Sequence, residues 1–429
     1  MKKFTTFLLA QLVFMLIFGA TALAQSPQQS HLYGVSGGAV SNPNDFVEIT
    51  HFDPQTSISE PLGTIYTMAV QEAIVHENIL YVTATDSLVA YDLVNETRLA
   101  AVAVSGTNLL KVVGDDLFMS VQYPETSGFL KVFDKNTLQL KATVDGISGE
   151  TAGMVVLNNK LFVAVPGSYG STDGSIAVID PFTYELLEEI NLGEGGIGIY
   201  TLYVYQNQIL TINKTPWGGT TGTLTWLNPD TYEFTHNNFS RTIGKGITII
   251  NEKLYLILNN GVGIIDLNSM IIVSNQFIED PGSAGYVYFG DIVYDTLLQQ
   301  FYVTITDYVT FGTGFIYDMQ GNVVNTFPAG ISTEALAVNY TQFTSLATVE
   351  ANEMMVYPNP AKDFIQLKNT VNKQIKTVKV FNMQAGLVLD QQVDNVSAVI
   401  DISAIAPGIY FLEIQLENGS YAMQKIVKH

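Results

Sequence analysis

Residues 76–92 read HENILYVTATDSLVAYD, and this stretch decides the fold. The turn residues Glu77 and Asn78 precede a β-branched and aromatic run, Ile79–Ala84. A second turn separates that run from Leu88–Asp92, which itself ends in a turn-forming residue. Short runs of this kind, bounded by turn residues, predict neighbouring β-strands joined by tight turns.

The same pattern recurs from residue 31 to residue 340 without a convincing helix. In each repeat an Asp or Asn ends an apolar run and opens a turn, because its side chain accepts hydrogen bonds from the backbone that follows. These turns are 38 to 52 residues apart. Four strands in about 40 to 50 residues form one blade of a β-propeller. The turns begin at Asp53, Asp92, Asp134, Asp180, Asn228, Asp266 and Asp318.

The seven turns predict an all-β, seven-bladed β-propeller over residues 31–340. The apolar run Ala335–Tyr340 has no blade of its own. We expect it to pair with the strands of residues 32–62 and to close the ring, which would remove an exposed sheet edge. A β-helix is the alternative, although its coils would be shorter and more even in length.

Composition excludes several classes of function. The 429 residues carry 40 Asp plus Glu against 19 Lys plus Arg, a net charge of −21. Nucleic acids and anionic membrane surfaces are therefore unfavourable partners, because both require a basic face. The chain has no Cys, which removes disulfides, thiolate nucleophiles, Cys-ligated zinc and any lipoprotein anchor on Cys.

The N-terminus has the pattern of a secretory signal peptide over residues 1–24. Lys2 and Lys3 precede the apolar stretch Phe7–Phe18, and Ala22-Leu23-Ala24 forms a small-x-small cleavage site. A transmembrane anchor is the alternative, but the stretch is short for a bilayer and Gln11 interrupts it. We therefore expect export, with no transmembrane segment in the mature chain.

The unit Tyr81–Thr85, followed by Leu88–Asp92, resembles the YVTN-type repeat of bacterial surface-layer propellers. The resemblance extends over residues 31–340 and implies a protein of the cell surface. Some relatives of this kind in Bacteroidetes bind cobalamin or other cofactors there, so the resemblance makes a corrinoid one candidate ligand.

The composition changes at residue 354, after a polar connector at 341–353. The stretch carries a Y-P-N-P start, a central D-x-S motif and a basic tail, in that order. With these motifs, residues 354–429 resemble the type A C-terminal sorting domain of the type IX secretion system of Bacteroidetes. The alternating strands predict a small Ig-like β-sandwich. The resemblance implies that the type IX machinery recognises this domain and usually removes it, with the cargo then anchored or released; an Ig-like module with its own ligand is the alternative. The motif residues are Tyr357, Pro358, Asn359, Pro360, Asp401, Ser403, Gly408, Tyr410, Lys425 and Lys428.

Three other patterns suggest chemistry but lack the required context. Gly34–Gly38 has the G-x-S-x-G form of a nucleophile elbow, and Gly193–Gly198 has the G-x-G-x-x-G form of a phosphate loop. Both motifs need a helix that follows, and the sequence offers a loop and a β-run instead. The five His residues do not have metal-ligand spacing. We therefore predict no catalytic residues and assign no metal ligands; a calcium ion on loops rich in Asp and Asn is the alternative, although no run has EF-hand spacing. The sequence leaves any cofactor unidentified.

Loop lengths indicate where a ligand could bind. The turns between first and second strands are short, whereas those between second and third strands are long in five blades, including Gly37–Asp45 and Asp307–Gly314. Long loops on a rigid scaffold commonly carry binding residues, and aromatic side chains are frequent anchors. The loops carry Tyr123, Tyr169, Trp217, Tyr308 and Phe311. On the same face, we expect the connectors between blades to bring Asn108, Glu150, Tyr200, Lys245, Tyr286 and Glu334 towards the central channel.

We therefore expect an exported propeller that binds a ligand on its long-loop face without acting on it chemically. The candidate ligands are a cofactor such as a corrinoid, a glycan or another protein. A lyase or glycoside hydrolase is an alternative, and it would need two carboxylates across the channel, for which Glu150 and Glu334 are the obvious pair. A structural or adhesion protein is the second alternative.

Overall fold

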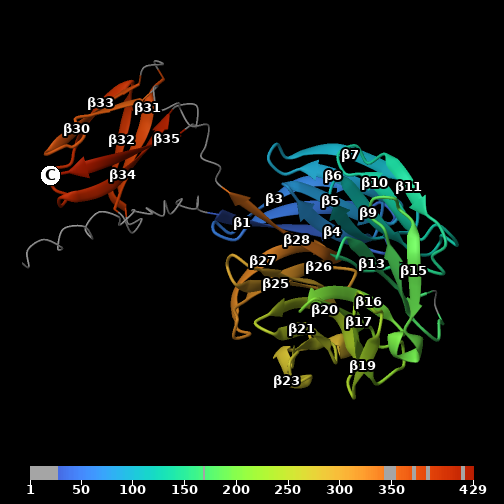
Figure 1. Cartoon of the computed structure of the whole chain (residues 1–429). Helices are drawn as coiled ribbons and strands as arrows, with labels where there is room; N and C mark the ends of the chain where they lie inside the picture. The colour runs from blue at the N-terminus through green and yellow to red at the C-terminus, as the bar shows by residue number, and fades with distance from the viewer. Residues whose placement is uncertain (1–27, 168–169, 343–353, 370–372, 383–386, 417–420) are drawn as a thin grey trace, which may run out of the picture. The chain divides into compact units, whose positions relative to one another are not determined.

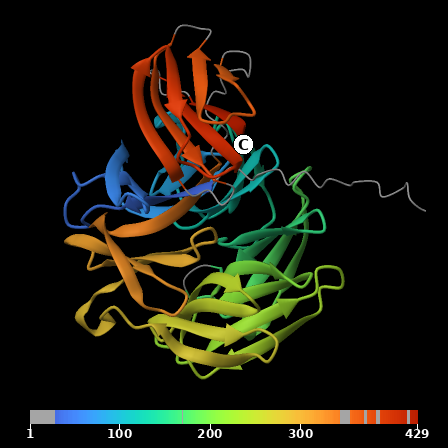
Figure 2. The same cartoon turned by 90° about the vertical axis from the view of Figure 1, so that its left-hand side faces the viewer.

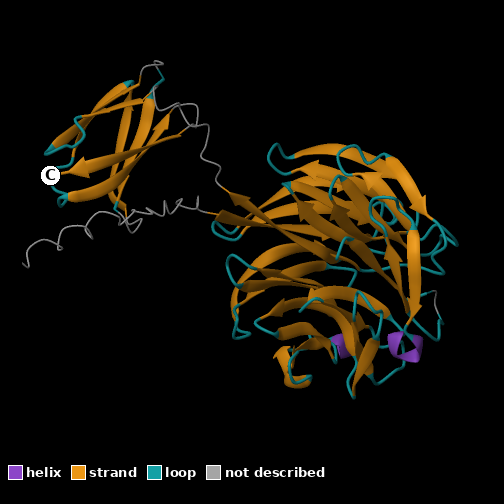
Figure 3. Ribbon diagram, viewed as in Figure 1, coloured by secondary structure: helices purple, strands orange, loops and turns teal. Residues whose placement is uncertain are grey.

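The computed structural model describes residues 28–167, 170–342, 354–369, 373–382, 387–416 and 421–429 (Figure 1). The predicted signal peptide, Tyr169 and most of the connector 341–353 lie outside the described residues. Among those described, strands dominate and the helices are two short 3-10 turns, η1 (Gly193–Gly196) and η2 (Ser283–Gly285) (Figure 3).

Seven four-stranded sheets follow one another along the first part of the described chain. The first joins β28 (Thr333–Gln342), β1 (Gln28–Ser36), β2 (Val47–Asp53) and β3 (Ile58–Ile65). The second and third are β4 (Val70–His76), β5 (Ile79–Ala84), β6 (Ser87–Asp92), β7 (Thr97–Ala103), and β8 (Thr107–Val113), β9 (Asp116–Val121), β10 (Leu130–Asp134), β11 (Leu140–Val144). The fourth and fifth are β12 (Met154–Leu157), β13 (Lys160–Val165), β14 (Ser175–Ile179), β15 (Leu186–Asn191), and β16 (Ile199–Tyr205), β17 (Gln208–Asn213), β18 (Gly222–Leu227), β19 (Phe234–Phe239). The sixth and seventh are β20 (Ile243–Ile250), β21 (Lys253–Leu258), β22 (Gly261–Asp266), β23 (Ile271–Ile278), and β24 (Tyr288–Asp295), β25 (Gln300–Thr306), β26 (Phe311–Tyr317), β27 (Val323–Ile331).

The sheets form a closed ring with the first strand of each sheet innermost (Figures 1 and 2). Inner strands contact those of the next sheet, from β4 and β8 through to β20 and β24. The ring closes at β28, where the Leu336 amide donates to Asp291 Oδ2 of β24 at 2.8 Å and the Asn339 side chain donates to Asn78 at 3.0 Å. The all-β, propeller-like prediction is confirmed, and β28 occupies the place predicted for the closing strand.

Burial explains why the second strand of each sheet is an unbroken apolar run. In β5, β9 and β13 almost every residue is buried, because adjacent sheets cover both faces. In the outermost strand β7, exposed and partly buried positions alternate from Leu99 to Ala103, since one face meets solvent. Between the third and fourth sheets, Phe118 and Val132 pack with Leu161 and Val163.

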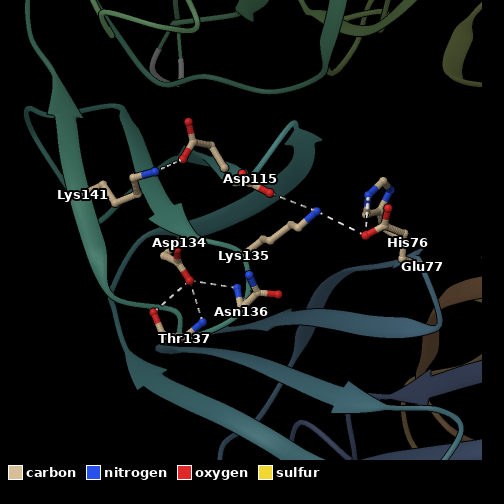
Figure 4. Close-up of polar contacts among 9 residues, drawn as sticks. His76, Glu77, Asp115, Asp134, Lys135, Asn136, Thr137 and Lys141 are labelled. Atoms are coloured by element: carbon tan, nitrogen blue, oxygen red, sulfur yellow. Dashed lines mark hydrogen bonds and ion pairs between the residues drawn. The ribbon is translucent and has the colours of Figure 1, made fainter.

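The recurring Asp residues form the turns between third and fourth strands. Figure 4 shows the turn in which Asp134 Oδ1 accepts the amides of Asn136 at 3.0 Å and Thr137 at 2.9 Å. The hydrogen bonds from Thr137 lower the pKa of Asp134. Lys135, the next residue, pairs with Glu77 of the second sheet at 3.2 Å. Turn chemistry therefore accounts for the repeated acids.

The C-terminal part is a separate β-sandwich; the chain divides into one compact unit over Gln29–Thr341 and another that includes Gln342–His429. One sheet of the sandwich joins β29 (Met354–Tyr357), β30 (Phe364–Asn369) and β33 (Ser397–Asp401). The other joins β32 (Leu387–Asn395), β31 (Ile375–Phe381), β34 (Gly408–Leu416) and β35 (Tyr421–Lys428). Their inner faces share a buried core that includes Ile365, Val378 and Leu412. The predicted sandwich is confirmed.

Candidate functional site

The two rims of the propeller differ in loop length. Five of the loops between second and third strands span 37–46, 122–129, 166–174, 214–221 and 307–310, whereas 85–86 and 259–260 close tightly. Turns between first and second strands take two residues in five sheets. The connectors from one sheet to the next share the rim of the longer loops, here called the long-loop rim. The loop of the seventh sheet is shorter than predicted, because Phe311 already begins β26.

The predicted aromatic residues differ in exposure. The exposed fraction is 95% for Trp217, 79% for Tyr123 and 79% for Phe311, so these side chains are available to a partner. Tyr308 is partly buried, with its ring centroid 6.0 Å from that of Tyr288. Tyr169 lies outside the described residues.

Two adjoining cavities open where the central channel meets the long-loop rim. One, of about 300 Å³, is lined by residues that include Glu72, Lys245 and Asp291. The other, of about 390 Å³, includes Lys214. Both include Gln71, Tyr200, Lys245 and Glu334, so they form one continuous site. We call this site the channel mouth and define it by Glu72, Tyr200, Lys214, Lys245, Asp291 and Glu334.

The topology places these side chains together. Every inner strand follows a connector on the long-loop rim, so the first residues of each inner strand lie at the channel mouth. Tyr200 and Glu334 are the second residues of β16 and β28, and Glu72 and Lys245 are the third residues of β4 and β20. Asp291 is the fourth residue of β24. Five sheets therefore contribute to one site.

Ion pairing and burial set the charges at the channel mouth. Lys245 Nζ forms an ion pair with Asp291 Oδ1, while Asp291 Oδ2 accepts the Leu336 amide. Glu72 Oε2 accepts the Leu110 amide, but burial raises the pKa of Glu72 to about 8. Burial also raises the pKa of Glu334. The raised pKa favours the protonated form of Glu72 at neutral pH, which presents an uncharged hydrogen-bonding group to the cavity.

Lys214 enters the channel mouth from the loop that follows β17. Its Nζ lies 3.0 Å from the centroid of the Tyr200 ring, in a cation–π contact. Burial, and secondarily the nearby charge of Lys245, lowers the pKa of Lys214 to about 7. Burial raises the pKa of Tyr200, so the phenol stays protonated.

A third cavity, of about 440 Å³, is lined by Tyr123 and Glu150 with other residues of the third and fourth sheets. Glu150 and Glu334 therefore line different cavities. Asn108 does not reach the channel either; it is buried, and its Nδ2 donates to the Thr151 carbonyl at 2.7 Å. Of the predicted connector residues, Tyr200, Lys245 and Glu334 are brought together. Asn108, Glu150 and Tyr286 do not join them, and Tyr286 is exposed.

Sequence reasoning missed Glu72, Lys214 and Asp291. Charged residues near the start of otherwise apolar inner strands were the available signal for Glu72 and Asp291.

Within the described residues, no group of three or more His, Cys, Asp or Glu side chains is placed to hold a metal ion. In the same residues, no helix is long and apolar enough to span a membrane.

In the sorting domain, hydrogen bonds link the Y-P-N-P segment to the C-terminal strand β35. Asn359 Nδ2 donates to the Lys425 carbonyl at 2.7 Å, and Asn359 Oδ1 accepts the Val427 amide at 2.9 Å. Tyr410 donates its hydroxyl to the Ala406 carbonyl at 2.8 Å. The Y-P-N-P segment and the basic C-terminal strand are thus held side by side.

Solved structures resemble the propeller-like fold at low sequence identity. A protein described as a 6-phosphogluconolactonase from Bacteroides uniformis ATCC 8492 gives a TM-score of 0.52 at 10% identity, over 73% of this chain and 99% of its own. A second, from Bacteroides fragilis NCTC 9343, gives 0.51 at 12% identity, over 73% and 98%. PorZ, a surface component of the type IX secretion system of Porphyromonas gingivalis, gives 0.42 at 12% identity over 93% of this chain, which spans 58% of PorZ. At these identities the likeness concerns the fold alone.

No curated protein matches the chain. Residues 355–429 match the family described as the secretion system C-terminal sorting domain, which confirms the predicted domain. A type IX sorting domain directs a protein to the cell surface or the extracellular space, as predicted. The chain is therefore an exported protein with a propeller-like domain and, at residues 355–429, a C-terminal sorting domain of the type IX secretion system.

Proposed function

We propose that this exported protein binds a ligand at the channel mouth without acting on it chemically. The observation that carries the proposal is the convergence of side chains from five sheets on one cavity system. Side chains that only stabilise a propeller pack between neighbouring sheets, whereas Lys214, Lys245 and Glu334 face a cavity. Ionisable groups with shifted pKa values that line a cavity are typical of functional sites.

The long loops extend the proposed site beyond the channel. Trp217 lies in the same loop as Lys214, and its side chain is almost fully exposed. An exposed Trp offers a large apolar contact at low entropic cost, as in other recognition surfaces. A cofactor such as a corrinoid, a glycan and a protein segment are the ligand classes we propose. The type IX secretion machinery is a separate partner, through the sorting domain.

An enzyme is the second candidate, and one observation favours it. Glu72, protonated at neutral pH, shares a cavity with the Asp291 carboxylate. A carboxyl group with a raised pKa beside a carboxylate that is ion-paired with a lysine is an arrangement that acid–base catalysis uses. However, Asp291 pairs with Lys245 through Oδ1 and accepts the Leu336 amide through Oδ2, so both of its oxygens already make contacts that stabilise the fold. The predicted pair, Glu150 and Glu334, lines two separate cavities, which argues against its use in glycoside cleavage.

Native mass spectrometry of the protein purified from its own host tests the proposal. We expect a co-purified small molecule, present in the wild type and lost in Trp217→Ala and Glu334→Gln. Phe182→Ala is the matched control, because Phe182 is an aromatic residue 74% exposed on a turn of the opposite rim. Each exposed substitution should change the free energy of unfolding by no more than about 0.5 kcal/mol.

Two outcomes would contradict the proposal. The first is an adduct that survives Trp217→Ala and Glu334→Gln but is lost in Phe182→Ala. The second is release of a chemically altered ligand on incubation, which would favour the enzyme. A protein that carries no small molecule but binds intact partner cells through its loops would favour the adhesion alternative.

A further inference from the structure

Two lysine side chains share the cavity of about 390 Å³ at the channel mouth. Lys245 extends from β20 and Lys214 from the loop after β17. Lys245 is paired with Asp291, whereas no carboxylate of the described residues pairs with Lys214. The contact that Lys214 makes is with the Tyr200 ring. One of the two ammonium groups therefore lacks a counter-ion.

The two ammonium groups also disfavour each other. Burial and the charge of Lys245 both act to remove the proton from Lys214. An anion located between the two side chains would reverse both effects, because it favours the charged form of each lysine. A negatively charged group in this cavity would therefore stabilise both lysines in their charged form. The protein as a whole is acidic, with 40 Asp plus Glu against 19 Lys plus Arg.

The acidic residues around the cavity do not serve as a counter-ion for Lys214. Asp291 is already paired with Lys245. Asp280 is engaged in its own turn, where its Oδ1 accepts the amides of Gly282 at 2.9 Å and Ser283 at 2.8 Å. Glu334 accepts the Ser332 hydroxyl at 3.2 Å, and Glu72 is uncharged at neutral pH. Lys111 also lines the adjoining cavity of about 300 Å³ and adds a further ammonium group.

We propose that Lys214 and Lys245 bind the carboxylate of an anionic ligand at the channel mouth. This inference rests on the proposed function and names the chemical class of its ligand. A monoanion suits the site better than a phosphate dianion, because Asp291, Asp280 and Glu334 would repel the second charge. The carboxylate can belong to a uronic acid of a glycan or to a free organic acid. The cavity is in the size range of small-molecule sites.

The test measures binding of D-galacturonate, D-galactose and L-lactate to the full-length chain by calorimetry. We expect galacturonate to bind and galactose, its uncharged counterpart, to bind at least about 10-fold more weakly. Binding of lactate with similar affinity would identify a free carboxylate as sufficient, whereas its absence would identify a uronate sugar. The loss of one charge-assisted contact corresponds to about 10- to 100-fold in affinity.

Lys214→Met should reduce carboxylate binding by that factor, since it keeps the apolar stem and leaves no unpaired acid behind. Lys214→Arg should restore binding to within a few-fold. Lys253→Met is the matched control, because Lys253 is an exposed lysine at the opposite rim, in the sheet that carries Lys245. A second readout is the pKa of Lys214, followed by NMR of labelled lysine side chains, which should rise when the carboxylate binds.

Equal binding of galacturonate and galactose, unaffected by Lys214→Met, would overturn the carboxylate inference and leave the proposed function standing. Binding that Lys253→Met reduces as strongly as Lys214→Met would also overturn it. Absence of binding for all three probes would overturn this inference, whereas the proposed function is decided separately by the co-purified molecule.

Discussion

Glu72→Gln should change how the stability of the propeller depends on pH. Burial raises the pKa of Glu72 from 4.5 to about 8. Between these two values the folded protein holds a proton that the unfolded chain has lost. The free energy of unfolding should therefore fall as the pH rises from about 4.5 to about 8, and this contribution should level off above that range. Glutamine keeps the acceptor for the Leu110 amide but cannot ionise.

The size of the effect follows from the shift. One pKa unit corresponds to about 1.4 kcal/mol, so the whole shift corresponds to about 5 kcal/mol at most. The Glu72 side chain is only partly buried, so solvent screening reduces the free-energy penalty. We expect Glu72→Gln to gain about 1 to 3 kcal/mol relative to the wild type between pH 5 and pH 7. Lys214 contributes in the opposite sense between about pH 7 and 10.5, so the measurement ends at pH 7.

Urea unfolding followed by tryptophan fluorescence isolates the propeller, because both tryptophans, Trp217 and Trp226, lie in its fifth sheet or the adjoining loop. Glu60→Gln on the outer strand β3 is the control, since its side chain is exposed. If the difference between Glu72→Gln and the wild type is the same at pH 5 and pH 7, the raised pKa is wrong and the reasoning about the channel mouth fails with it.

Two further predictions concern the packing of the ring, and urea unfolding measures both. Gly314→Ala should lower the free energy of unfolding by about 1 to 3 kcal/mol, because its Cβ would overlap the Phe327 ring. Gly285→Ala is the control and should be close to neutral, because the space around Gly285 is open. Equal effects of the two substitutions would refute this packing argument. Leu336→Ala should lower the free energy of unfolding by about 2 to 5 kcal/mol, because Leu336 is buried at the ring closure. Val324→Ala is the control and should lower it by less than about 0.5 kcal/mol, because Val324 is exposed. A small loss for Leu336→Ala would mean that the closing strand contributes little to stability.

The sequence predicted the fold well because the fold depends on local rules. Turn residues such as Asp134 act through hydrogen bonds two and three residues away, so their spacing along the chain reports the spacing of the strands. The apolar run at Ala335–Tyr340 needed a partner, and only the first sheet lacked an inner strand. The length of the loop in the seventh sheet was overestimated, because Phe311–Gly314 pairs in β26 despite its glycines.

The site was harder to predict, because it depends on which positions face the channel. Adjacent residues in an inner strand point to different surroundings: Ala73 is buried against the first sheet, whereas Glu72 lines the channel cavity. The presence of an aromatic residue in a loop did not predict the exposure of its side chain either, since Trp217 is exposed and Tyr308 is partly buried. Lys214 was missed because its partner, Tyr200, lies on another strand of the sheet and follows a separate connector.

Closure of the ring and formation of the channel mouth depend on the same side chain. Asp291 uses Oδ1 to pair with Lys245 and Oδ2 to accept the amide of Leu336 in the closing strand. The position of β28, and with it Glu334, is therefore coupled to the ion pair that orients Lys245. The charged groups at the inner strand ends face the channel, so they do not displace the apolar packing between sheets. The loops above them carry no such constraint. The rigid ring thus fixes the charged part of the proposed site, and the long loops are the part that can differ without disturbing the fold.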